Sequence, residues 1–170
     1  MWKLRIDSHF RWLRTSALAL CCLATPAHAA SVSTTFTVTA TVLASCDVTA
    51  SNLDFGNYTS GAGSDTTANT TVDVTCTNGT HYTIALDGGS VAHDPAARAM
   101  SAGGSSLLNY GLFTDASCTT VWGDGTGATT TMSGTGDGTA QPTTIYGRIP
   151  AGQYVPATQY TDQITVQVTY

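Results

Sequence analysis

The sequence predicts an all-β protein of the two-sheet sandwich type. After residue 30, apolar and polar residues alternate repeatedly with a period of two, and no segment carries apolar residues at helical spacing over three turns. Glycine, asparagine and proline punctuate these segments at intervals that suit short strands and tight turns. The wealth of Thr, Ser, Gly and Asn fits the same fold.

The first residues of the chain are expected to be a secretion signal rather than part of the fold. Four basic residues precede a short apolar run at 16–24, and Ala27-His28-Ala29 is a small-x-small cleavage pattern. The apolar run is too short to span a bilayer. Cleavage would leave 141 residues, the usual size of one domain. We therefore predict a signal peptide at 1–29, an N-terminal extension at 30–45 and one sandwich domain at 46–170.

The cleanest period-two pattern comes first, at residues 31–43, with no Gly or Pro to interrupt it. Threonine and serine occupy one face of this predicted strand. The apolar positions of the other face are Val32, Phe36, Val38, Ala40 and Val42.

Shorter strands are expected to follow Cys46. Asn78-Gly79 separates a predicted strand at 71–76 from one at 82–86, which is a strong hairpin signal, so these two strands are expected to be antiparallel neighbours. Further strands are predicted at 107–113, 119–122, 129–133, 143–149 and 163–170.

The charge of the mature chain argues against a nucleic-acid partner. Arg98 and Arg148 are its only Lys or Arg residues, and with ten Asp and no Glu the formal net charge is −8. Such a chain does not attract phosphates.

Three cysteines remain after cleavage, and two of them are expected to pair in an oxidising compartment. We expect the pair to be Cys46–Cys76. This bond would close a loop of about 31 residues and add roughly 3–4 kcal/mol to the free energy of unfolding in a chain-entropy estimate. Cys118 is then left over, either as a buried free thiol or as an intermolecular bridge.

Catalytic and cofactor chemistry finds little support, so no enzyme activity, cofactor or metal is expected. The mature chain has two histidines, His81 and His93, and no Ser lies in a Gly-x-Ser-x-Gly context. Asp124 and Asp137 lie among glycines but lack the nonapeptide period of stacked calcium sites, so tight turns explain them better. Trp122 and the tyrosines could form a sugar-binding platform, although a β core of this size needs such aromatics.

Two interpretations of residues 31–43 follow from the pattern. In one, this segment is simply the first strand of its own domain. In the other, it completes a neighbour's sheet by β-augmentation, in which backbone hydrogen bonds supply affinity and alternate side chains fill pockets.

The order of motifs from Cys46 onward resembles the spore coat protein U domain, the module from which Csu-type chaperone-usher pili are built. The resemblance covers essentially the whole mature chain. The segments that carry it are Leu53–Gly56, Val74–Gly79, Tyr82–Leu86, Leu108–Asp115, Val121–Gly125, Ile145–Gln153 and Tyr160–Tyr170.

This resemblance implies an incomplete immunoglobulin-like sandwich, completed first by a periplasmic chaperone's strand and then by the N-terminal strand of the next subunit. It places residues 31–43 at the donor strand and matches Cys46–Cys76 to the family's disulfide. Cys118 departs from the family pattern. The edge that a chaperone or donor would pair with is the C-terminal strand, with Ile164, Val166, Val168 and Tyr170.

The expected function is a shaft subunit of a pilus that supports adhesion or biofilm formation. Its expected partners are the periplasmic chaperone, an outer-membrane usher and other copies of itself or related subunits, and it would pass through the periplasm to the cell surface. One domain with a retained donor strand favours a shaft subunit over a tip subunit. The alternatives are a secreted carbohydrate-binding module and a spore or cell-surface coat protein with a self-contained sandwich.

Overall fold

The computed structural model describes residues 28–170, so the predicted signal peptide lies outside the described residues except for its last two. The chain divides into two units, residues 1–39 and residues 40–170. Residues 28–45 carry no assigned strand or helix. Everything below concerns the second unit unless the extension is named.

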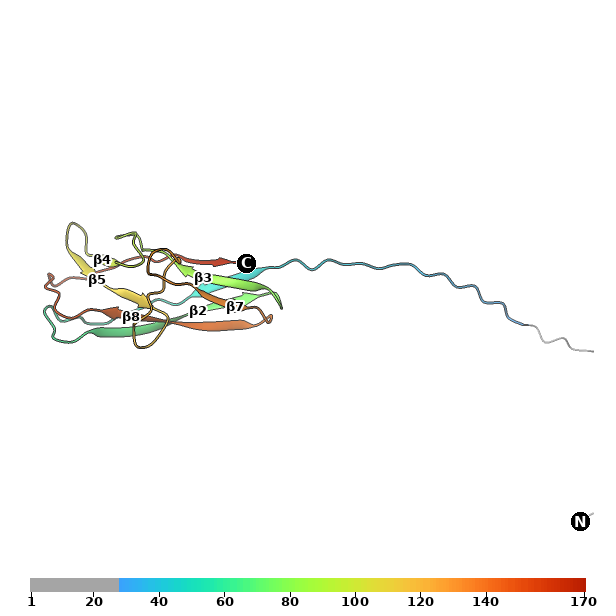
Figure 1. Ribbon diagram of the computed structural model, residues 1–170, viewed down its shortest axis with the longest axis horizontal. Helices are drawn as coiled ribbons and strands as arrows, with labels where there is room; N and C mark the ends of the chain where they lie inside the picture. The colour runs from blue at the N-terminus through green and yellow to red at the C-terminus, as the bar shows by residue number, and fades with distance from the viewer. Residues whose placement is uncertain (1–27) are drawn as a thin grey trace, which may run out of the picture. The chain divides into compact units, whose positions relative to one another are not determined.

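The second unit is all-β, and its strands form two antiparallel sheets and a short pair (Figure 1). One sheet has the order β1-β2-β8-β6, the other has the order β7-β3-β9, and β4 pairs with β5. The strands are β1 (Cys46–Ala50), β2 (Thr66–Cys76), β3 (His81–Leu86), β4 (Ala99–Ser101), β5 (Leu107–Asn109), β6 (Gly111–Phe113), β7 (Met132–Thr135), β8 (Ala140–Ile149) and β9 (Val166–Thr169).

The core lies between the two sheets and is made by the period-two pattern. Every second residue at the end of β2 is buried, namely Val72, Val74 and Cys76, and the same is true of Tyr82, Ile84 and Leu86 in β3. Strand β8 adds Ile145 and Ile149 from the first sheet. Two antiparallel sheets that bury one face each against a shared core are a β-sandwich, which confirms the predicted fold class.

The predicted hairpin between the second and third strands is wrong. β2 pairs with β1 and β8, whereas β3 pairs with β7 and β9 in the other sheet. Asn78-Gly79 does make a tight turn, with Gly79 at a φ of 80°, but Gly79 N donates to the Gly136 carbonyl rather than closing a hairpin. The turn carries the chain from one sheet to the other.

Other strand boundaries also differ from the prediction. The expected strand at 107–113 is split at Tyr110 between β5 and β6, and 119–122 makes only isolated bridges at Val121 and Trp122. The strand expected at 129–133 begins later, at Met132, because Thr129 Oγ1 is tied into a turn with the Thr126 carbonyl. Strand β8 starts before the predicted 143, and β9 is shorter than 163–170. Strands β1 and β4 were not predicted.

The structure contains the expected Cys46–Cys76 disulfide, which joins β1 to β2 at opposite residues of their ladder. Cys118 is a buried free thiol, the first of the two states considered for it. Burial raises the pKa of this thiol above its ordinary value. Among the described residues, no helix is long and apolar enough to cross a membrane.

Removing the disulfide is expected to lower the free energy of unfolding by about 2–5 kcal/mol. The variant is Cys46→Ala with Cys76→Ala. Urea unfolding is followed by the fluorescence of Trp122, the only tryptophan after residue 12 and fully buried. The matched control is Cys118→Ala, which removes a buried thiol but no cross-link and is expected to cost only about 1 kcal/mol. Equal urea midpoints for the double variant and the unmodified chain would contradict this prediction.

Candidate functional site

Strand β1 is an edge strand whose inward face is not covered. Directly opposite residues of an antiparallel pair share a face, and Val48 lies opposite Val74. Val74 is 0% exposed, yet Val48 is 36% exposed. Ala50, opposite the fully buried Val72, is exposed as well. The inner face of β1 therefore has the orientation of a core strand without the burial of one.

Strand β9 is the matching edge of the other sheet. Asp87 N donates to the Thr165 carbonyl, so the odd-numbered residues of this segment direct their backbone groups at β3. The even-numbered residues Ile164, Val166 and Val168 therefore direct theirs at the open edge. The side chains of these three residues are half-buried against the core.

The same alternation holds in β1. Thr77 N donates to the Ser45 carbonyl and Ser51 N to the Thr71 carbonyl, so odd-numbered residues pair with β2. The backbone groups of Cys46, Val48 and Ala50 point to the open edge. Both edges thus combine inward apolar side chains with outward backbone groups, the arrangement that a further strand could pair with.

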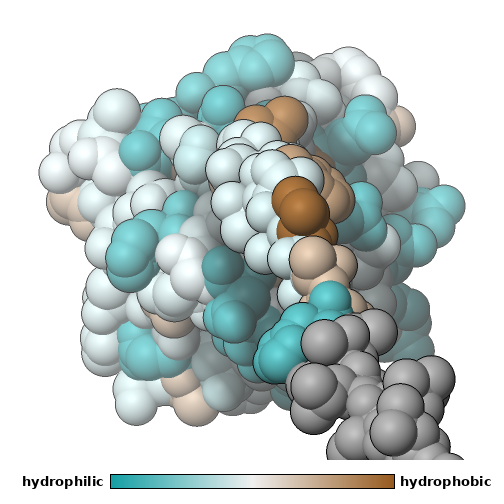
Figure 2. Space-filling view, turned by 90° about the vertical axis from the view of Figure 1, so that its right-hand side faces the viewer, coloured by the Kyte–Doolittle hydropathy of each residue, from teal (hydrophilic) through white to brown (hydrophobic). Residues whose placement is uncertain are grey.

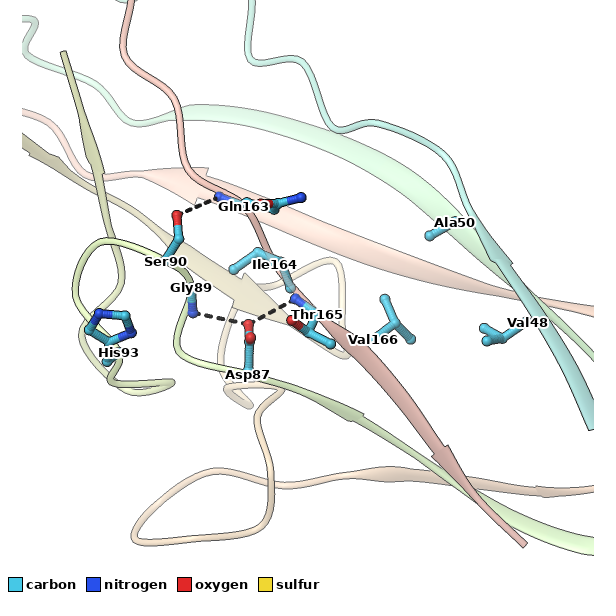
Figure 3. A pocket seen from close by; sticks show the side chains of 10 residues that line it. All are labelled: Val48, Ala50, Asp87, Gly89, Ser90, His93, Gln163, Ile164, Thr165 and Val166. Carbon is cyan, nitrogen blue, oxygen red and sulfur yellow. Dashed lines mark hydrogen bonds between the residues drawn. The ribbon is translucent and has the colours of Figure 1, made fainter. Parts of the chain in front are cut away.

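A hollow of about 500 Å³ lies between these two edges, and we call it the edge groove. Figure 3 shows Val48 and Ala50 on one side of it and Ile164 and Val166 on the other. Its remaining lining residues are Asp87, Gly89, Ser90, His93, Gln163 and Thr165. The groove therefore has an apolar part along the strands and a polar part at the loop that follows β3.

A second hollow, of about 400 Å³, lies further along the same two chain segments. Its walls come from residues 53–60, which follow β1, and from residues 155–160, which precede β9. Leu53, Phe55 and Tyr58 on the first segment and Val155 and Tyr160 on the second are partly buried against the core. Half-buried apolar side chains thus line both of the hollows.

Asp87 holds the polar end of the edge groove together. Its Oδ1 accepts hydrogen bonds from Thr165 N at 2.9 Å and Gly89 N at 3.0 Å (Figure 3). Burial alone would raise the pKa of Asp87, but the hydrogen bonds from Thr165 and Gly89, with the charge of Arg98, outweigh burial and lower the pKa below 3.8. The ionised carboxylate thereby fixes the start of the β9 edge.

Asp162 fixes the same segment from its other side. Its Oδ1 accepts from Ser90 N and Ser90 Oγ, both at 2.9 Å, and its Oδ2 accepts from the Tyr110 hydroxyl at 2.7 Å. Burial, followed by this hydrogen bond, raises the pKa of Tyr110 well above its ordinary value. A side chain at Gly89, where φ is 79°, would collide with the Asp162 carboxylate. The close approach therefore requires glycine.

Arg98 is the buried cation behind this network, with 1% exposure. Its Nε donates to the Asp87 carbonyl at 2.9 Å, and its Nη1 donates to the Pro95 carbonyl at 3.0 Å. Nη2 donates to the carbonyls of Asp87 and Leu86. Because a buried guanidinium needs such partners, Arg98 ties the end of β3 to the loop beside the groove.

The side chains expected to serve as a donor strand are exposed in the described chain. Phe36 is 86% exposed, and Val32, Val38 and Val42 are also largely exposed. Ala40 is exposed as well. Figure 2 shows apolar atoms, in brown, on the segment that leads from the grey residues. A segment with such a face has apolar surface to bury in a partner.

The structure places the predicted edge residues as follows. Ile164 and Val166 line the edge groove, Val168 continues the same inward face, and Tyr170 is exposed beyond the end of β9. The sequence did not indicate Val48 and Ala50, because a short strand with one half-exposed apolar side chain has little signal. Nor did it indicate the carboxylate of Asp87, which lines the groove, or that of Asp162, which bonds the groove residue Ser90.

Trp122 cannot belong to the sugar-binding platform that the sequence left open. This side chain is fully buried, and its Nε1 donates to the Ile84 carbonyl at 3.1 Å, so it cannot stack on a sugar. Asp124 and Asp137 cap tight turns, accepting from the backbone N of Thr126 and of Thr139 respectively. This agrees with the turn interpretation of the glycine-rich loops.

Replacing Asp87 with Asn is expected to weaken the fold mainly near neutral pH. Because the pKa of Asp87 is lowered in the fold, its stabilising contribution is present above about pH 4 and is lost as the pH falls through the folded value. The Asp87→Asn variant should therefore be clearly less stable at pH 6 and closer to the unmodified chain at pH 3. Urea midpoints from Trp122 fluorescence at the two pH values measure this. A stability difference that widens at pH 3 would count against the assigned role of Asp87.

Comparison with known proteins identifies relatives over most of the chain. Residues 32–167 match the Spore Coat Protein U domain, a range that includes most of the extension as well as the sandwich. Protein U of Myxococcus xanthus is 30% identical over an alignment of 160 residues, which covers 85% of this chain and 88% of that protein.

Among solved structures, the chain is similar to one in the chaperone–tip adhesion subunit pre-assembly complex from archaic chaperone-usher Csu pili of Acinetobacter baumannii. The identity is 26% and the TM-score is 0.58. The match covers 76% of this chain but only 40% of that one, so the chain spans less than half the length of this structural relative. The family match over most of its length shows that the chain belongs to the Spore Coat Protein U domain family.

Proposed function

We propose that this protein is a pilus subunit that polymerises by donor-strand exchange. Residues 31–43 of one copy enter the edge groove of the next copy and complete its sandwich. One observation carries this proposal: the two facing edges, β1 and β9, present inward apolar side chains and open backbone groups, and the same chain carries an exposed segment with the complementary alternation.

The donor segment supplies both parts of the joint. Its backbone pairs with the open groups of β1 and β9, and Phe36, Val38 and Val42 enter between the sheets. Burying these three side chains contributes about 1.5–3 kcal/mol each. Val32 extends the same face at its N-terminal end, and Ala40 lies on it between Val38 and Val42. A joint of this size dissociates slowly, because all the backbone and side-chain contacts of one strand must break together.

The partners follow from the same groove. Before assembly, a periplasmic chaperone fills it with a strand of its own, and an outer-membrane usher then receives the subunit at the cell surface. The structural relative described above is a chaperone–subunit complex from a chaperone-usher pilus, which supports this order of events. The chain carries a donor segment of its own, which supports a place in the shaft. The assembled fibre would serve in adhesion or biofilm formation.

The proposed role is structural and needs no catalysis. Three ionisable side chains lie near the groove, and all of them form hydrogen bonds that hold loops and strand ends. They are Asp87, Asp162 and Arg98. A carbohydrate-binding role loses its strongest candidate because Trp122 is fully buried. Tyr146, which is half-buried on β8, remains the aromatic residue with which that alternative can be tested.

Replacing Phe36 with Asp is expected to abolish polymerisation, because a charge would have to enter the apolar part of the groove. The full chain is co-expressed with the periplasmic chaperone and the usher of its pilus system. Surface material is then compared on SDS gels before and after boiling. The unmodified chain should give a ladder that collapses on boiling, and Phe36→Asp should give monomer while still binding the chaperone.

The matched control is Thr37→Asp, which adds the same charge on the opposite face of the same segment and should leave the ladder intact. Deletion of 31–43 should remove the ladder as completely as Phe36→Asp does. A stable monomer from both the full and the shortened chain would instead mean a self-contained sandwich. Glycan binding lost on Tyr146→Ala would then favour a binding module, and deposition on a surface without fibres would favour a coat protein.

A further inference from the structure

The junction between the donor segment and β1 is short and held in place. Ser45 donates through its N to Thr77 Oγ1 at 3.2 Å, and its carbonyl accepts from Thr77 N at 2.9 Å. The next residue, Cys46, is covalently bound to Cys76. The ladder between β1 and β2 therefore extends back to Ser45. Only Leu43 and Ala44 separate this ladder from Val42, the last apolar residue of the donor face.

The junction also lacks the residues that reverse a chain. No Gly, Pro, Asn or Asp occurs between residues 30 and 46, and the first glycine after residue 30 is Gly56. Among the described residues other than glycine, only His93 and Cys118 have positive φ, so Ser45 does not adopt the left-handed conformation that tight hairpin loops use. A chain that turned back at this point would need that conformation from residues that disfavour it.

The period of two adds a stricter condition. If the donor segment folded back beside its own β1, its even-numbered apolar residues would have to lie opposite the inward residues Cys46, Val48 and Ala50. A two-residue loop at 43–44 would pair Val42 with Ser45 and turn every apolar donor side chain to the outer face. The shortest loop that keeps them inward is a three-residue loop at 43–45, which pairs Val42 with Cys46.

That three-residue loop is the one that the chain opposes. Such loops place their third residue in the left-handed conformation, usually as glycine. Here the third residue is Ser45, which the structure holds in the ladder with Thr77. A five-residue loop at 41–45 would consume Val42 and shorten the donor face, and one at 43–47 would take Cys46 and Asp47 out of their ladder with β2.

We infer that the junction Leu43–Ala44–Ser45 prevents the chain from filling its own edge groove, so that in the assembled fibre the occupant is residues 31–43 of a second copy. This inference rests on the proposed function and adds to it the reason why assembly is intermolecular. A donor that folded back beside its own β1 through a hairpin would be antiparallel to β1 and parallel to β9. A donor from a second copy is free of that restriction and can pair antiparallel with β9.

The test compares two variants that carry the same Asn-Gly pair at positions one residue apart. Ala44→Asn with Ser45→Gly creates the three-residue loop of correct register, with glycine at its third position. Leu43→Asn with Ala44→Gly introduces the same Asn-Gly pair but permits only the two-residue loop, which faces the apolar side chains outward. Each chain is expressed in the periplasm without its chaperone, and soluble monomer is measured by gel filtration. Polymer formation is measured with the chaperone and usher present, on unheated SDS gels.

Ala44→Asn with Ser45→Gly is expected to raise soluble monomer roughly tenfold or more and to remove the ladder, because an intramolecular donor acts at an effective concentration near millimolar. Residues 31–43 of this monomer should resist limited proteolysis. Adding Phe36→Asp to this variant should abolish the gain, which shows that the donor face fills the groove. Leu43→Asn with Ala44→Gly should show no gain in soluble monomer and no protease protection of 31–43, because its two-residue loop turns the apolar side chains outward.

Two results would overturn the inference. One is a ladder from both Asn-Gly variants, with 31–43 protease-sensitive in each monomer. The other is an unmodified monomer in which 31–43 is already protected. Failure of the proposed function looks different: the ladder of the unmodified chain would then persist after deletion of 31–43, whatever the junction variants do.

Discussion

The structure depends on the relation between side-chain direction and backbone direction at its two facing edges. In both β1 and β9, the residues whose side chains point into the sandwich are the ones whose backbone N–H and C=O groups point to the open edge of the sheet. A single extended segment can therefore satisfy the backbone and cover the core at once. The alternation that buries Val74 and Ile84 elsewhere leaves Val48 and Val166 only partly covered here. The groove is thus the place where one strand of the sandwich is absent.

The polar end of the groove is rigid for a separate reason. Asp87 and Asp162 hold both sides of the segment that leads into β9, and Arg98 and Tyr110 support them from inside the fold. An edge strand bonded on one side only would otherwise fray, since half of its backbone groups have no strand beside them. This network holds the start of the β9 edge in place. It also accounts for a buried arginine in a chain with so few basic residues.

The sequence predicted the fold class because the period-two pattern is strong wherever a strand is covered on its inner face, as in β2, β3 and β8. It failed where that covering is missing, since β1 offers only the half-exposed Val48 and the small Ala50. The Asn78-Gly79 signal was read correctly as a turn but wrongly as a hairpin, because local sequence does not say which sheet the next strand joins. The disulfide and the β9 residues were anticipated. The β1 edge of the groove was not, because it lies more than one hundred residues from β9 in the chain.

The Cys46–Cys76 bond determines how a pulling force on the N-terminal extension would be transmitted to the domain. A force applied through residues 31–43 enters the domain at β1, and an edge strand pulled from its end would unzip one hydrogen bond at a time. The covalent link transfers that load at once to Cys76 at the end of β2, the longest strand, which is paired along its length with β8. Tension on the extension therefore acts on the centre of the sheet in shear, and β1 is protected from peeling.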